Sequence, residues 1–158
     1  MLLTGGAREF VVEMKYRGGW HLRGDLRALV HQMEPLKKFV RGAVLVPVPL
    51  HPRRMRWRGF NQARWVAEAM AAEGEAAGIE DLIVRVRNTP TQTRLNRKAR
   101  EKNMKDAFAL SPRAVVKFDQ RYILVDDVFT TGATLNECAK VLRRGGAGFL
   151  DAATLAHG

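Results

Sequence analysis

The segment Tyr122-Ile-Leu-Val-Asp-Asp-Val-Phe-Thr-Thr-Gly-Ala-Thr134 decides the fold. It begins with a run of largely apolar residues, which is typical of a strand that is buried on both faces of a parallel sheet. Asp126 and Asp127 follow this run, at the predicted carboxyl end of the strand. Because open α/β sheets bind ligands at the carboxyl ends of their strands, the sequence predicts a ligand site here.

A helix is predicted directly after the small-residue turn that covers residues 130–134. Thr134 and Glu137 have the spacing of a capping box, and one apolar face would be formed by Leu135, Cys138, Ala139 and Leu142. The N–H groups at the start of such a helix, together with its dipole, favour an anion. Carboxylates beside an anion cradle suit a ligand with both hydroxyls and a phosphate, as in a ribose 5-phosphate.

Two other protein classes contain an apolar strand that ends in acids. In receiver domains this strand lies near the N-terminus, whereas here only the last fifth of the chain follows it. In P-loop ATPases it accompanies a G-x-x-x-x-G-K-[ST] motif, and this chain has none. The ribose-phosphate interpretation is therefore favoured over both.

Length and composition indicate one cytoplasmic globular domain. The chain has 158 residues and a hydrophobic fraction of 46%, enough for a single core. No apolar run reaches the roughly 18 residues that span a membrane, and the N-terminus lacks the pattern of a signal peptide. Cys138 is the only cysteine, and its place on the apolar helix face favours a core residue over a reactive thiol.

The net charge of +11 is unevenly distributed along the chain. Residues 35–67 and 82–100 contain no acid, and each of these segments carries several arginines. Three interpretations stay open: a solvated basic surface, a site for a small polyanion such as a diphosphate, and a site for a nucleic-acid backbone. Trp57 and Trp65, in the first segment, are predicted to pack in a lid or the core rather than to stack on bases.

The remaining pattern predicts strands that alternate with helices, and so an α/β domain with a mostly parallel, twisted sheet flanked by helices. Helices are expected at residues 7–16, 20–33 (closed by Pro35) and 63–74. Further strands are expected at residues 43–48, 82–87, 115–118 and 149–156. A stiff proline-rich loop and a basic turn would cover residues 47–58, residues 88–107 would form a lid that closes with Phe108 in the core, and Gly145-Gly146 would cap the last helix.

The chain resembles the type I phosphoribosyltransferases at the segment quoted first, where an apolar strand, two acids, two further residues and Thr-Thr-Gly-x-Thr follow one another. Further stretches are similar to the ComF branch of that family. They are Val46-Pro-Val-Pro-Leu50, Arg58-Gly-Phe-Asn-Gln62, Gln92-Thr-x-Leu95, Arg100-x-x-Asn103 and Ala107-Phe108. The resemblance extends from about residue 7 to the end of the chain.

This resemblance implies a type I phosphoribosyltransferase-like fold that binds 5-phosphoribosyl 1-diphosphate (PRPP) or a nucleoside monophosphate with Mg²⁺. Asp126 and Asp127 would be the catalytic acids, which hold the ribose hydroxyls and, directly or through water, the metal ion. The 5′-phosphate would bind the turn of Thr130, Thr131, Gly132, Ala133 and Thr134. The diphosphate would bind Val48, Pro49, Leu50, Arg53 and Arg54, under a flexible lid that carries Arg94, Arg97, Arg100 and Asn103.

The expected organisation is a single domain over residues 1–158, with a helical hood at residues 1–40 and a PRPP-binding core at residues 43–158. Many ComF relatives carry a four-cysteine zinc module, which cannot form in a chain whose only cysteine is Cys138. A homodimer is an open alternative. Three functions are compatible with this pattern: a phosphoribosyltransferase with an unidentified acceptor, a PRPP- or nucleotide-binding regulator without turnover, and a protein that binds single-stranded DNA during DNA uptake.

Overall fold

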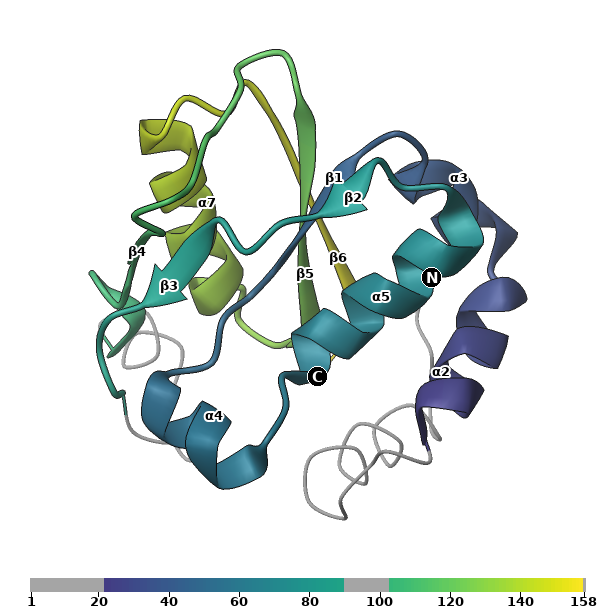
Figure 1. Cartoon of the computed structure of the whole chain (residues 1–158), viewed down its shortest axis with the longest axis horizontal. Helices are drawn as coiled ribbons and strands as arrows, with labels where there is room; N and C mark the ends of the chain where they lie inside the picture. The colour runs from purple at the N-terminus through teal and green to yellow at the C-terminus, as the bar shows by residue number, and fades with distance from the viewer. Residues whose placement is uncertain (1–21, 90–102, 158) are drawn as a thin grey trace.

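A computed structural model describes residues 22–89 and 103–157 of the chain (Figure 1). The helices whose bounds lie within these ranges are α2 (Leu22–His31), α3 (Glu34–Val40), α4 (Pro52–Arg58), α5 (Gln62–Gly74) and α7 (Ala133–Arg144). The strands are β1 (Val44–Pro47), β2 (Gly78–Ile79), β3 (Ile83–Arg85), β4 (Phe108–Leu110), β5 (Arg121–Phe129) and β6 (Phe149–His157). Within these ranges, none of the helices combines the length and apolar character that crossing a membrane requires.

The central sheet has the strand order β2-β1-β5-β6, and all its pairings are parallel. A separate antiparallel pair, β3 and β4, lies beside it. The predicted fold class, an α/β domain with a mostly parallel sheet flanked by helices, is confirmed. It is the architecture expected for a type I phosphoribosyltransferase-like domain.

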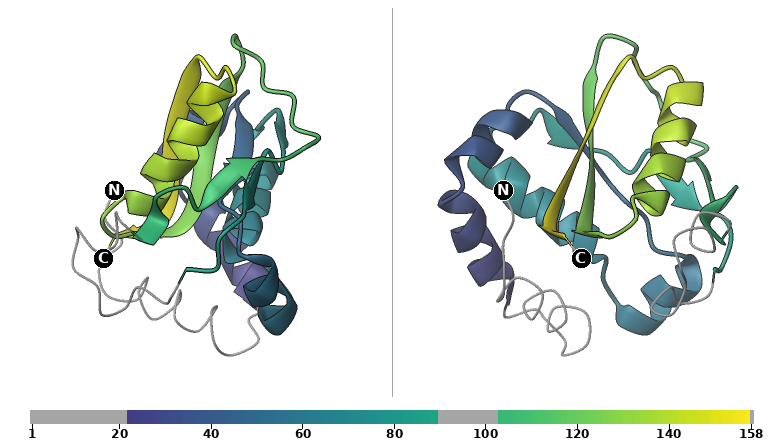
Figure 2. Two further views of the ribbon diagram at one scale, coloured as in Figure 1. Left: turned by 90° about the vertical axis from the view of Figure 1, so that its left-hand side faces the viewer. Right: turned by 180° about the vertical axis from the view of Figure 1, so that it is seen from behind.

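Helices cover both faces of the sheet because β1 and β5 are apolar on both sides (Figures 1 and 2). On one face, Ile123 and Val125 of β5 join a buried cluster with α2, α3 and α5. On the other face, Tyr122 and Leu124 join a cluster with α7, β3 and β4. This alternation is the period of a strand, and its continuous burial explains why the segment reads as an unbroken apolar run.

The helices before β1 differ from the prediction at Pro35. The sequence predicts that Pro35 closes one helix, but α2 ends at His31 and Pro35 lies in the first turn of α3. A proline is favourable in a first turn because its missing N–H would have no helical acceptor there. Both helices pack against α5, with Arg23 of α2 paired to Glu68. The helix predicted at residues 7–16 lies outside the described residues.

Three local predictions are wrong. The basic turn expected at residues 53–58 is the helix α4, because His51 caps its start and Gly59, in the left-handed conformation, ends it. The strand expected at residues 82–87 is shortened to β3 and pairs with β4 rather than with the central sheet. Residues 115–118 form no strand, and Val115 and Phe118 are exposed. The short edge strand β2 has no clear sequence signal, since it contains only two residues.

Gly74 provides a test of the packing between α3 and α5. A Cβ atom at this position would lie 2.3 Å from Val40 Cγ2 and 3.0 Å from the Lys37 carbonyl oxygen. We therefore expect Gly74→Ala to lower the free energy of unfolding by about 1–3 kcal/mol, measured by urea denaturation. Gly24→Ala is the matched control, because nothing lies within 4 Å of its Cβ position and alanine favours a helix. Equal stability of the two variants would contradict this packing.

Candidate functional site at the carboxyl ends of β1 and β5

The parallel pairing of β1 and β5 brings two distant segments together at one end of the sheet. Pro47, the last residue of β1, is in register with Val125, and the Val48 N–H group donates to the Val125 carbonyl at 2.9 Å. The proline-rich segment thus continues the ladder by one hydrogen bond before it leaves the sheet. As a result, the loop after β1 begins directly beside Asp126.

The two acids lie within β5, because the strand continues to Phe129 instead of ending at Val125. Successive side chains of a strand alternate between its faces, so Asp126 lies on the α7 side and Asp127 on the α5 side. Asp127 is only 8% exposed, and its N–H group donates to Oδ1 of Asp126 at 2.9 Å. The pair therefore presents carboxylates on both sides of the strand end.

The turn after β5 leaves the start of α7 open to an anion. Gly132 is the N-cap residue, with a φ of 73° that favours glycine, and no side chain caps the helix. The capping box predicted from Thr134 and Glu137 is therefore wrong, since Glu137 pairs with Lys140 instead. Among the described residues, the N–H groups of Ala133, Thr134 and Leu135 have no acceptor. Thr130 is exposed, whereas Gly132 and Ala133 are buried.

Asn61 fixes the loop after β1 to the start of α5. Its side-chain oxygen accepts from the Ala63 N–H group at 3.1 Å, which caps α5. Its side-chain nitrogen donates to the Val48 carbonyl oxygen at 3.0 Å. One residue thus determines both where α5 begins and where the predicted diphosphate loop runs.

His51 lies directly before the basic helix α4 and caps its start. Burial lowers the pKa of its imidazole, and the cations of Arg85, Arg53, Arg54 and Arg56 lower it further. The ring is therefore neutral at neutral pH, and Nδ1 accepts the Arg53 N–H group at 3.3 Å as the cap of α4. Among the described residues, the positive charge that acts on His51 therefore comes from these four arginines.

Two arginines from different segments converge on Thr89. Arg54 of α4 donates to the Thr89 carbonyl oxygen at 3.0 Å, and Arg85 of β3 donates to the Thr89 hydroxyl. Arg85 is only 8% exposed, packs over the Phe108 ring and has an Nε atom without a partner among the described residues. Burial and then Arg54 lower the pKa of Arg85, while Asp126 partly offsets them.

This convergence brings together the two acid-free segments, residues 35–67 and 82–100. Neither Arg54 nor Arg85 forms an ion pair with a carboxylate within residues 22–89 and 103–157. Sequence reasoning missed Arg85 and Thr89 as site residues. Arg85 was one arginine in a basic run, and its burial depends on Phe108, which lies more than twenty residues later in the chain.

The remaining predicted residues are only partly described. Arg94, Arg97 and Arg100 lie outside the described residues, and Asn103 begins the described segment that leads into β4. Met104, which falls within the predicted lid, is fully buried in the core. Phe108 is also buried, as predicted. Cys138 is a core residue as predicted, because it is fully buried and burial raises the pKa of its thiol well above the ordinary value.

The two tryptophans have different environments. Trp65 is buried and stacks on Phe60 with ring centroids 4.1 Å apart, which confirms its predicted core position. Trp57 is 76% exposed on α4, so a core position is wrong for it. Arg53 and Arg56 are exposed on the same side of α4, since residues three and four apart are neighbours on a helix.

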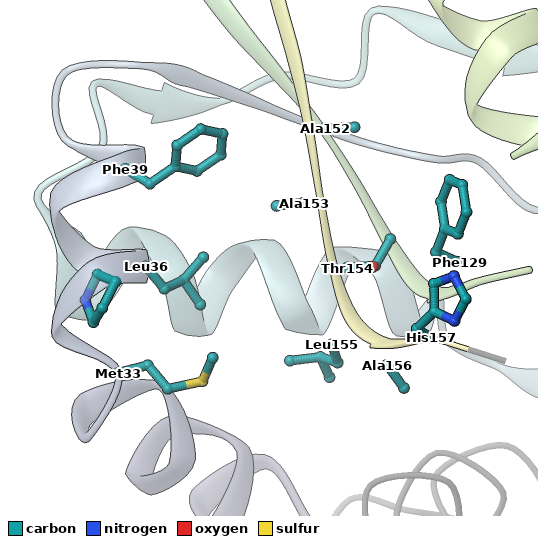
Figure 3. A pocket seen from close by; sticks show the side chains of 11 residues that line it. Met33, Leu36, Phe39, Phe129, Ala152, Ala153, Thr154, Leu155, Ala156 and His157 are labelled. Atoms are coloured by element: carbon teal, nitrogen blue, oxygen red, sulfur yellow. The ribbon is translucent and has the colours of Figure 1, made fainter. Parts of the chain in front are cut away.

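A largely apolar groove of about 490 Å³ lies between α3 and β6 (Figure 3). Leu36 and Phe39 line one wall, and Leu155 lines the other. At one end, the rings of Phe129 and His157 stack with centroids 5.3 Å apart. The groove was not predicted, because its walls come from opposite ends of the chain. No cluster of three metal-ligating side chains occurs in the part of the chain that the structure describes.

Curated proteins similar to this chain are named for competence and DNA use. It is 41% identical to "Competence protein F" of Haemophilus influenzae over 103 residues, which cover 63% of this chain and 44% of the relative. It is 40% identical to "DNA utilization protein YhgH" of Salmonella typhi over 103 residues, 65% of this chain and 44% of the relative. It is 32% identical to "Competence protein ComFC" of Streptococcus pneumoniae over 141 residues, 89% of this chain and 58% of the relative.

These relatives confirm the resemblance to ComF-type proteins that the sequence motifs indicate. The chain matches only about half of the length of each relative. No protein-family model matches it. Among solved structures, a purine phosphoribosyltransferase from Pyrococcus horikoshii has a TM-score of 0.49 and 16% identity, over 87% of this chain and 74% of that one.

Asn61 allows the two roles of the β1 loop anchor to be separated. We expect Asn61→Ala to lower the free energy of unfolding by about 1–2 kcal/mol, because it removes the α5 cap and the bond to Val48. Asn61→Asp keeps a capping oxygen but cannot donate to the Val48 carbonyl, so its loss of stability should be smaller. Hydrogen exchange at residues 48–51 should be faster in both variants. Unchanged exchange in Asn61→Asp would show that Asn61 does not hold this loop.

Proposed function

We propose that this chain, a homologue of the ComF-type competence proteins, binds PRPP with Mg²⁺, or a nucleoside monophosphate, at the carboxyl ends of β1 and β5. The observation that carries the proposal is that carboxylates and groups suited to bind phosphate lie together at one end of the sheet. Carboxylates on β5 suit hydroxyls and a metal ion, while the open start of α7 and the arginine pair at Thr89 suit phosphates. A ribose that carries phosphate groups at both ends needs both.

The 5′-phosphate would bind at the first turn of α7. Here the N–H groups of Ala133, Thr134 and Leu135 have no acceptor among the described residues, and the helix dipole favours an anion. Gly132 supports this role, because a Cβ atom there would lie 3.1 Å from the Phe129 ring. A larger residue would also be strained by the φ of 73°, so glycine keeps this turn in the conformation that leaves the start of α7 open.

The diphosphate would bind between the β1 loop and β3, where Arg54 and Arg85 both reach Thr89. Arg54 and Arg85 have no ion-pair partner among the residues that the structure describes, so their guanidinium charges repel each other, and a bound polyanion would relieve that repulsion. The buried Arg85 supports this assignment most strongly, because a buried cation is costly unless it is paired. Guanidinium groups also match phosphate geometry with two parallel hydrogen bonds.

The acid pair fits a hydrated Mg²⁺ ion rather than a tightly chelated one. Consecutive carboxylates on a strand point to opposite faces, so both cannot readily bind one ion directly. Mg²⁺ commonly keeps several waters and binds one or two carboxylates together with substrate oxygens. Asp126, on the α7 side with Arg85, would orient the metal–diphosphate unit, and Asp127 would accept hydrogen bonds from the ribose hydroxyls. The metal would neutralise charge that develops on a leaving diphosphate.

Transfer of phosphoribose to an acceptor is the reaction that this arrangement would support. Arg54 and Arg85 would stabilise the charge of the departing diphosphate, which is the largest need of such a step. The apolar groove between α3 and β6 supports an acceptor site, because Thr154 in its wall is in register with Asp126. The names of the relatives favour a competence or DNA-utilization context. The acceptor itself is unidentified.

Calorimetry with PRPP and MgCl₂ tests the proposed ligand. We expect Asp126→Asn, Asp127→Asn and Arg85→Gln each to weaken binding by about 1.5–3 kcal/mol, the range of a charged hydrogen bond. Asp25→Asn is the matched control, since Asp25 is an exposed acid on α2, away from the site. If the variant with both Asp126 and Asp127 changed to Asn binds PRPP as tightly as the unmodified chain, the site assignment is wrong.

Single-stranded DNA is a second candidate ligand, and the exposed face of α4 favours it. Arg53, Arg56 and Trp57 lie together on this face, and Trp57 is 76% exposed. An indole between guanidinium groups offers stacking for a base and charge for a phosphate backbone, without sequence preference. Arg53, which the resemblance assigns to the diphosphate, would serve DNA on this face, whereas Arg54 of the same helix would serve the diphosphate together with Arg85.

Fluorescence anisotropy with labelled oligonucleotides at low salt tests this surface. Arg53→Ser together with Arg56→Ser should reduce the slope of log affinity against log salt by roughly 1.4, because two phosphate contacts are lost. Trp57→Ala should weaken binding without changing this slope. Arg143→Ser with Arg144→Ser removes the same charge from the end of α7 and should have little effect. Equal effects of the two charge variants would mean that only net charge matters.

A further inference from the structure

Three large apolar side chains are exposed together at the amino-terminal end of the sheet. Val115 is 70% exposed, Phe118 73% and Phe149 57%, and the two phenylalanine ring centroids are 6.4 Å apart. Single exposed apolar residues are ordinary in soluble proteins, but a contiguous group often marks an interaction surface. We call Val115, Phe118 and Phe149 the apolar tip.

The backbone holds the apolar tip in place. The Gly148 N–H group donates to the Phe118 carbonyl oxygen at 3.2 Å, and a Cβ atom on Gly148 would lie only 2.5 Å from that oxygen. The Lys117 N–H group donates to the hydroxyl of the buried Tyr122 at 2.8 Å. These hydrogen bonds hold together the chain segments before β5 and β6. The rings of Phe118 and Phe149 therefore stay at the surface instead of packing on the core.

Basic side chains surround the apolar tip in sequence. Arg113 and Lys117 lie on the same loop, and Arg143 and Arg144 form the last turn of α7, shortly before Phe149. All four are exposed, and none forms an ion pair with the residues that the structure describes. Asp119 is the single acid of the loop at residues 111–120. The segments that carry the tip therefore combine exposed apolar side chains with an excess of positive charge, four cations against Asp119.

The apolar tip lies at the opposite end of the molecule from the candidate ligand site. The loop at residues 111–120 projects beyond the body at the top of Figure 1, whereas α4 and the carboxyl ends of β1 and β5 lie at the bottom. Neither the groove at α3 and β6 nor the one between α2 and α5 is lined by residues of the tip. The loop that carries Val115 and Phe118 thus projects from the body of the domain.

We propose that the apolar tip docks the protein on an anionic lipid surface. A projection with apolar side chains and a basic rim can enter the soft interface of a bilayer, where the rings are buried and the cations meet lipid phosphates. A peptide that paired with β6, which is an edge strand of the sheet in the described part of the chain, would run along that strand rather than over the tip at its start. A second copy of the chain would bring eight cations together, which would repel one another. Nucleic-acid bases would find no flat surface for stacking, because the two phenylalanine rings are inclined at 58°.

Docking through the apolar tip would leave the candidate PRPP site and the exposed face of α4 accessible to ligands. In the docked orientation α4 and the candidate PRPP site face away from the membrane, because they lie at the other end of the sheet (Figures 1 and 2). The protein would thus present both sites to ligands at a membrane surface. The inference does not depend on PRPP binding, since no residue is shared between the two surfaces.

Co-sedimentation of the full chain with vesicles tests the inference. We expect binding to vesicles of equimolar phosphatidylcholine and phosphatidylglycerol, and none to phosphatidylcholine alone. Phe118→Ser with Phe149→Ser should weaken binding roughly tenfold at unchanged net charge. Val86→Ser is the control for apolar exposure, because Val86 is 55% exposed on another surface, and it should bind normally. If circular dichroism shows that the double variant folds poorly, Val115→Ser replaces it, and this variant should also bind the anionic vesicles more weakly.

Charge variants complete the test. Arg143→Ser with Arg144→Ser should weaken binding to the anionic vesicles roughly tenfold, whereas Arg53→Ser with Arg56→Ser should have a smaller effect. The inference is overturned if the phenylalanine variants bind as well as the unmodified chain, because the attraction would then be nonspecific. It is also overturned if anionic vesicles are not bound. A dimer in sedimentation velocity that these variants dissociate would instead assign the tip to a second copy.

Discussion

The pairing of β1 with β5 is the constraint on which the rest of the site depends. Their parallel register continues through Pro47 and Val125 to the hydrogen bond from Val48, so the loop after β1 leaves the sheet beside the acid pair. Asn61 then holds this loop by its Val48 carbonyl and starts α5 at the same time. A slip of the pairing by one residue would turn the acids to the wrong faces and move the basic segment away from them.

The acids and the arginines near this pairing come from different elements and do not fully neutralise one another. Asp126 and Asp127 lie on one strand, while Arg54 and Arg85 approach from α4 and β3 and meet at Thr89. Neither arginine forms an ion pair within the described residues, and Asp126 only partly offsets their charge. Such an arrangement lowers stability and would be relieved by a bound polyanion, which is why it supports a ligand site better than a structural role. Arg53 and Arg56 of α4, and the cations near the apolar tip, are exposed and so carry no such penalty.

The sequence predicted what depends on local pattern and missed what depends on packing. The β5 run, the helix after it and the glycine cap at its end were all predictable, because apolar period and small residues specify them directly. The helix α4 was missed because Pro52 and four arginines read as a loop, although proline suits a first turn. The capping box failed because Gly132, and not Thr134, is the N-cap. Arg85 could not be identified, since its burial depends on Phe108.

An amide NMR titration with PRPP and MgCl₂ tests the central claim most directly, because it locates the ligand without relying on any substitution. We predict that the largest shifts occur at Ala133, Thr134 and Leu135, at Val48 and at Thr89, the places where the open helix start, the β1 loop and the arginine pair meet. Shifts confined to the groove between α3 and β6, or to the exposed face of α4, would contradict the account. So would the absence of any shift at saturating PRPP.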